Sequence, residues 1–301
     1  MASNLFWFYD AFAVGILLIG LYCGAKRGLM RSVVLVALLI ASVVLSWIIS
    51  TVGAPVIYEN FIEQRVLTSL KEASFKTDPL SIVSSAVRSG GYGVEMTDNE
   101  IEGVITQTGD FFQNIASEIK SNGASESEGA IGSGVEDTVT ESMLRALVGD
   151  VVSPNTLREI LESVSGAENS VRQTVDVFLN GDRTATASAV ESKLVAPAVK
   201  FILKGIIWVV SMMILTLLAK SIANAFRGLN RVPIIGPVNS LLGAALGLAE
   251  GALMVYVISQ IVKLIMYLTE NSLMFLNADT VARTYAFKHF VYFNVMTLMG
   301  R

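Results

Sequence analysis

Four long apolar segments are the feature that most constrains how this chain of 301 residues can fold. A helix needs about 20 residues to cross the hydrocarbon core of a bilayer. Residues 5–24, 32–52, 201–219 and 238–262 meet that length, and each carries at most one charged side chain. Only 16% of all residues are charged, whereas soluble domains have about 25%. The sequence therefore excludes a single soluble globule and predicts an all-α integral membrane protein with four transmembrane helices.

Charge is distributed unevenly along the chain. Residues 53–196, which separate the second and third apolar segments, hold 10 Lys and Arg against 22 Asp and Glu. Their net charge is −12, and the rest of the chain has a net charge of +8. We therefore predict that an acidic, water-soluble domain is inserted between two membrane pairs, residues 1–52 and 197–268. Nucleic acid is not expected as a partner, because its recognition needs a basic surface.

Capping signals predict that this insert consists of short helices. Asp-Pro at 78–79 is typical of a helix start, and Gly-Gly at 90–91 is typical of a helix end. Thr97 with Glu100 forms a capping box, and Ser-Pro at 153–154 starts a further amphipathic pattern. The Ser-, Gly- and Glu-rich stretch 121–137 is expected to be a flexible loop. Two interpretations stay open: the insert is a spacer between the membrane pairs, or it binds a ligand or partner.

Clusters of Lys and Arg predict the orientation in the membrane. The connections within the two membrane pairs carry these cations: Lys26, Arg27, Arg31, Lys220, Arg227 and Arg231. Short cytoplasmic loops are enriched in Lys and Arg, so both connections are expected in the cytoplasm and residues 53–196 outside it. The first apolar segment has no basic residue before it, which indicates a retained anchor rather than a signal peptide.

A ladder of glycines is the most specific pattern in the last apolar segment. Gly243, Gly247 and Gly251, hereafter the glycine ladder, recur every fourth residue and so share one helix face. Such a face lets a second helix backbone approach closely. Its partner is either another segment of this chain or a second copy, as in a homo-oligomer. The Pro- and Gly-containing element at 233–237 precedes the ladder and indicates a loop or a short re-entrant turn.

Two carboxylates lie within apolar segments. Glu250 is expected either to face a polar interior, where it pairs with a basic residue or binds a proton or cation, or to be wetted at the interface. Asp10 has aromatic neighbours, which places it at the depth of the lipid headgroups. The tail, residues 269–301, mixes aromatic and basic side chains and is predicted to be an amphipathic helix lying in the interface.

The sequence offers no constellation for catalysis. Cys23 and His289 are the single cysteine and the single histidine. One cysteine excludes an intrachain disulfide, and a zinc site usually needs three or four gathered ligands. Neither a nucleophile–base pair nor a metal cluster can be assembled. We therefore expect a protein that is not an enzyme and that has no cofactor or metal.

Two motifs, taken together, are similar to one known family. The residues concerned are Asp10, Lys26, Arg27, Gly28, Pro233, Gly236 and Asn239, followed by the glycine ladder. In this order they resemble the CvpA family, the colicin V production proteins. The resemblance covers roughly residues 5–52 and 200–268, whereas the long insert departs from the short members of the family.

The resemblance implies a bacterial inner-membrane accessory protein with no established biochemical activity. Such proteins are associated with colicin V production or export and with envelope homeostasis. The expected partners are the lipid bilayer and either further copies of the chain or other envelope proteins. Two alternatives stay open: a small oligomeric channel or transporter packed on the glycine ladder with Glu250 in its path, and a surface receptor that uses the insert.

Overall fold

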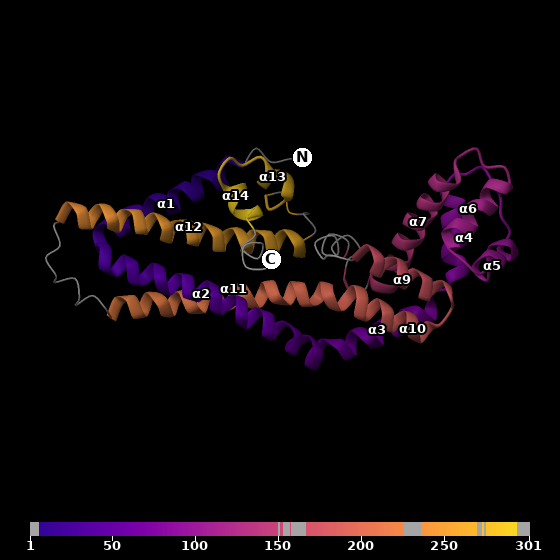
Figure 1. Cartoon of the computed structure of the whole chain (residues 1–301), viewed down its shortest axis with the longest axis horizontal. Coiled ribbons are helices and arrows are strands. Elements are labelled where there is room, and N and C mark those ends of the chain that lie inside the picture. Colours follow the sequence, from indigo (N-terminus) through magenta and orange to yellow (C-terminus); the bar gives the residue numbers. More distant parts are fainter. Residues whose placement is uncertain are drawn as a thin grey trace. The chain divides into compact units, whose positions relative to one another are not determined.

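The computed structural model describes residues 6–149, 151–152, 157, 167–225, 236–269, 273 and 275–293. Every regular element in these residues is a helix, as the sequence predicts (Figure 1). The chain divides into two compact units. We call Met1–Pro55 with Ile202–Arg301 the bundle unit, and Val56–Phe201 the insert unit. Both ends of the insert unit lie a few residues further along the chain than the corresponding ends of the predicted insert, residues 53–196.

Four long helices form the frame of the bundle unit. They are α1 (Phe6–Arg27), α2 (Leu29–Ile57), α11 (Ala196–Ala225) and α12 (Gly236–Leu268). All four are long and apolar enough to cross a membrane, in agreement with the prediction. Each is longer than its predicted apolar segment, because a helix continues past the apolar residues until a stop signal ends it.

Large apolar side chains stand exposed along these four helices. Between 59% and 72% of the residue surface is exposed at Leu18, Ile19, Val52, Leu217 and Leu241. Water-soluble proteins rarely expose contiguous apolar surface on this scale. The outer face of the bundle unit is therefore suited to contact with lipid.

The helices of the bundle unit form two pairs (Figure 1): α1 lies close against α12, and α2 contacts α11 through side chains. In the second pair, Leu35 and Leu39 of α2 pack on Ala219 and Ala223 of α11. Ser46 on α2 also contacts α11 through the sulfur of Met212, at 3.7 Å.

The tail differs from the single amphipathic helix that was predicted. Its described part forms two short helices, α13 (Ala278–Ala282) and α14 (Phe287–Tyr292). Val281, Phe287 and Val291 are buried in a cluster with Ala13 of α1 and Val255 of α12. These apolar residues of the tail thus pack on the bundle itself, and the position of the tail in the interface stays a prediction.

The insert unit consists of short helices. They are α3 (Glu63–Lys76), α4 (Pro79–Ser89), α5 (Asp98–Ile105), α6 (Phe111–Ser121), α7 (Glu128–Val148), α9 (Ala167–Leu179) and α10 (Arg183–Val190). The predicted start of α4 at Asp78-Pro79 is confirmed, as is its end at Gly90. The capping box of Thr97 and Glu100 at the start of α5 is present in full.

The prediction of a flexible loop over residues 121–137 is wrong for most of that range, because α7 begins at Glu128. The hydroxyl of Ser127 accepts a hydrogen bond from the backbone N–H of Ala130, which caps the helix start. The residues Ile131, Val135 and Val139 are then buried at helical spacing. Composition indicated a loop here, but the apolar spacing decides the structure. Of the helix predicted from 153–154, only Leu157 lies inside the described residues.

Candidate functional site

Glycines from both helices meet where α1 packs against α12. Gly20 and Gly24 lie against Gly247 and Gly243, main chain against main chain. A Cβ atom added to Gly243 would lie 2.5 Å from the carbonyl oxygen of Gly24, closer than real Cβ atoms come. The two backbones can therefore approach this closely only because both helices carry glycine at these positions.

The partner of the glycine ladder is thus α1 of the same chain. The sequence left open whether a second copy fills this groove, and in this structure α1 occupies it. Sequence reasoning missed the matching glycine on α1, Gly20. The available signal was its spacing, since Gly20, Gly24 and Gly28 also recur every fourth residue.

Gly28 alone makes the connection between α1 and α2, where a longer basic loop was expected. Its φ is +77°, in the left-handed region that favours glycine. A Cβ atom at this position would also lie 2.8 Å from Nδ2 of Asn239. The other side-chain atom of Asn239, Oδ1, accepts a hydrogen bond from the backbone N–H of Leu29 at 2.6 Å. Asn239 therefore caps the start of α2 and fills the space beside Gly28.

Arg27 and Glu250 form an ion pair between the same two helices, α1 and α12. Nη1 of Arg27 donates to Oε2 of Glu250 at 2.7 Å. The side chain of Glu250 is only 8% exposed, whereas that of Arg27 is 28% exposed. A carboxylate removed from water is costly unless it is paired. The geometry thus favours the paired interior position for Glu250 over the wetted one.

Asp10 joins the tail to α1. Its carboxylate accepts hydrogen bonds from the backbone N–H groups of Tyr285, Ala286 and Phe287, at 2.7, 2.9 and 3.0 Å. These amides lie at the start of α14, where N–H groups have no partner within the helix. Asp10 is therefore the acceptor that caps α14 from a distant part of the chain, a role that its aromatic neighbours in the sequence did not indicate.

Replacing Asp10 with alanine is expected to release the tail. The loss of hydrogen bonds to a charged acceptor should speed deuterium exchange at residues 285–292 by about 10- to 100-fold. Hydrogen exchange of the full chain in nanodiscs, followed by mass spectrometry, measures the exchange rate of these residues. Asp279→Ala is the matched control, since Asp279 is exposed on α13. Equal exchange in the two variants would contradict the anchoring role.

Of the remaining motif residues, Lys26 and Gly236 lie in the described part of the chain. The ammonium of Lys26 lies 4.8 Å from the centre of the Tyr22 ring. Gly236 is the first residue of α12, and Pro233 lies outside the described residues, so the predicted loop or re-entrant turn stays a prediction. Sequence reasoning missed Asn224 of α11, whose Oδ1 accepts a hydrogen bond from Arg31. No spacing pattern in the sequence pointed to it.

Four buried serines of the bundle unit bond to their own helices. Ser42, Ser50, Ser211 and Ser259 donate to carbonyl oxygens three or four residues earlier, at 2.8, 2.9, 3.1 and 2.7 Å. Each hydroxyl is thereby satisfied without water or another polar side chain. These serines act as small packing residues.

In the insert unit, Arg172 is the centre of a charged group. It bonds Asp110 at 2.9 Å and lies 3.6 Å from Glu136, beside a hollow of about 450 Å³ between α6 and α7. Burial raises the pKa of Glu136 and that of Asp176, and the charge of Asp110 raises both further. Arg172 opposes both shifts. The guanidinium therefore compensates several carboxylates that share this part of the domain.

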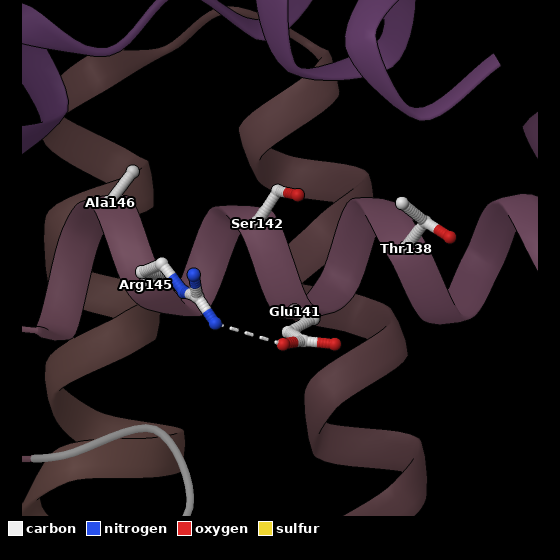
Figure 2. A pocket seen from close by; sticks show the side chains of 5 residues that line it. All are labelled: Thr138, Glu141, Ser142, Arg145 and Ala146. Atoms are coloured by element: carbon white, nitrogen blue, oxygen red, sulfur yellow. Dashed lines mark hydrogen bonds and ion pairs between the residues drawn. The ribbon is translucent and has the colours of Figure 1, made fainter. Parts of the chain in front are cut away.

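A second hollow, of about 440 Å³, lies on the surface of α7 (Figure 2). Figure 2 shows that the lining residues in the described part of the chain come from this one helix: Thr138, Glu141, Ser142, Arg145 and Ala146. The two charged side chains among them bond each other at 3.1 Å, one helical turn apart. Such a pair is typical of a solvated helix face, so this hollow is not a candidate site.

Within the described part of the chain, no group of three or more His, Cys, Asp or Glu side chains could hold a metal ion. A scan against models of protein families, a search of curated proteins and a search of solved structures each found no match. The resemblance to the CvpA family therefore depends on the motif residues alone. What the structure adds is that Arg27, Gly28 and Asn239 meet at one corner of the bundle unit, and that Arg27 there pairs with Glu250.

Proposed function

We propose that this chain is a CvpA-type accessory protein of a bacterial inner membrane, without enzymatic activity, that supports toxin production or export and envelope homeostasis. In this proposal, the bundle unit is a fixed membrane anchor. The acidic insert unit is held outside the cytoplasm, where it contacts other envelope proteins.

One observation carries the anchor role: the glycine ladder is filled by α1 of the same chain. Two polar groups nearby are also satisfied within the chain, Glu250 by Arg27 and the first amide of α2 by Asn239. An oligomeric channel packed on this face would instead need the glycines to be free for a second copy. The geometry therefore favours a self-contained anchor over an oligomeric channel.

A cysteine-accessibility experiment tests the orientation. In a Cys23→Ser background, Ser125→Cys places a thiol at an exposed position of the insert, and Lys26→Cys places one beside Gly28. A membrane-impermeant maleimide should label Ser125→Cys in spheroplasts, and should label Lys26→Cys only after permeabilisation. The reverse pattern would overturn the extracytoplasmic position of the insert.

A deletion experiment tests the role of the insert. Residues 56–201 are replaced by a short Gly-Ser linker, and the variant is expressed in cells that lack the full chain. We expect the shortened protein to accumulate in the membrane but to restore neither detergent resistance nor colicin V export. Full restoration would show that the insert is a spacer, and ion flux through proteoliposomes of the full chain would favour the channel.

A further inference from the structure

The two helices that connect the insert unit to the rest of the chain share an unusual feature. The helix through α2 and α3 is interrupted by a π-helical turn, η1 (Tyr58–Ile62), and the helix through α10 and α11 by a second, η2 (Glu191–Val195). A proline accompanies each turn: Pro55 precedes η1, and Pro197 follows η2. Proline removes a helix hydrogen bond, and single π turns are rare and often occur at functional positions. Both helices are therefore weakened at corresponding places.

The two π turns contact each other through their first residues. Oη of Tyr58 donates to Oε1 of Glu191 at 2.7 Å, and both residues are buried, at 1% and 8% exposure. Lys200, just after Pro197, lies 3.2 Å from Oε1 of Glu59. Its ammonium is also 5.0 Å from the centre of the Tyr58 ring. One network of four side chains therefore spans both weakened helices.

This arrangement has a mechanical consequence. A helix bends where prolines or π turns interrupt its hydrogen bonds. If one of the two helices bends alone, Tyr58 and Glu191 separate, and a buried carboxylate loses its donor. The hydrogen bond therefore opposes independent bending of either helix.

We propose that η1 and η2 form one paired joint, at which the two connecting helices bend together and which the Tyr58–Glu191 hydrogen bond holds closed. The joint is a conformational device of the insert, and it does not depend on the function proposed above. Breaking the hydrogen bond should free both helices at once.

Pulsed electron paramagnetic resonance on the full chain in nanodiscs tests this joint in a Cys23→Ser background. Spin-label pairs are placed across η1, across η2 and, as a control, along the uninterrupted helix α7. The labelled positions are exposed: Val52 with Thr68, Ser188 with Ile206, and Ala130 with Ala146. The labels are sixteen residues apart in two pairs and eighteen apart in the pair across η2, which is about 24–27 Å along a straight helix and within range of the method.

The wild-type chain should give narrow distance distributions for all three pairs. Tyr58→Phe removes only the hydroxyl group and should broaden the distributions across both η1 and η2, leaving the α7 pair narrow. Glu191→Gln keeps an oxygen acceptor and should leave all three narrow. Broadening across one turn only would overturn the pairing, and no broadening, or wild-type distributions that are already broad, would overturn the closing role of the hydrogen bond.

A second variant covers the case in which Tyr58→Phe also broadens the α7 control, which would indicate misfolding. Glu191→Leu removes the acceptor oxygen of the hydrogen bond and leaves the Tyr58 hydroxyl in place without it. It should broaden both joint pairs, as Tyr58→Phe does. With a narrow α7 pair, unchanged distributions in this variant would overturn the proposal.

Discussion

Leucine in place of Gly247 is expected to destabilise the bundle unit by about 3 kcal/mol or more. A Cβ atom at this position would collide with the carbonyl oxygen of Gly20 and the Cα atom of Gly24. These are backbone atoms, so no side chain can rotate out of the way. α1 and α12 would have to separate and lose the close packing that stabilises helix pairs in lipid. Titration of the detergent-solubilised chain with SDS, followed by circular dichroism, measures the change in the free energy of unfolding.

Gly15→Leu is the matched control for this substitution. Gly15 lies on α1, the helix that packs against α12, but nothing outside its own helix lies within 4 Å of the place where its Cβ atom would be. A leucine there points into open space, and we expect a change within about 0.5 kcal/mol. A similar loss of stability in both variants would mean that the substitution disturbs the helix itself, and would contradict the packing role of the glycines.

The helical frame could be predicted from the sequence because its signals are local. Apolar length alone locates all four long helices, and capping residues such as Asp78 and Thr97 locate the starts of α4 and α5. Helix ends were predicted less well, because hydropathy marks where lipid ends and not where the helix stops. Thus α2 runs five residues beyond the predicted end at 52.

The contacts of the candidate site could be predicted only in part. Spacing shows that the glycine ladder shares one face, but it does not show what lies against that face. In the same way, a lone carboxylate in an apolar segment indicates that a partner is needed without naming it. Glu250 finds that partner 223 residues away, in Arg27. The dual role of Asn239 also depends on a tertiary contact, since Leu29 lies 210 residues away.

The substitution Arg27→Met is expected to cost about 3–5 kcal/mol, because it leaves the carboxylate of Glu250 buried without its partner. Glu250→Met should cost less. Arg27 is 28% exposed against 8% for Glu250, so its long side chain can carry the free guanidinium toward the aqueous interface. The double variant should be more stable than Arg27→Met alone. The same SDS titration gives the four free energies of a double-mutant cycle.

Lys26→Met provides the comparison that isolates the ion pair. Lys26 is the neighbouring cation at the end of α1, and its ammonium lies 4.8 Å from the centre of the Tyr22 ring. Its loss should cost about 1 kcal/mol or less. If Arg27→Met were no more costly than Lys26→Met, the ion pair would not stabilise the bundle unit. A large coupling free energy between Arg27 and Glu250 would instead mean that Glu250 is held as a structural partner. A carboxylate that relays protons or cations must be able to leave its counter-ion.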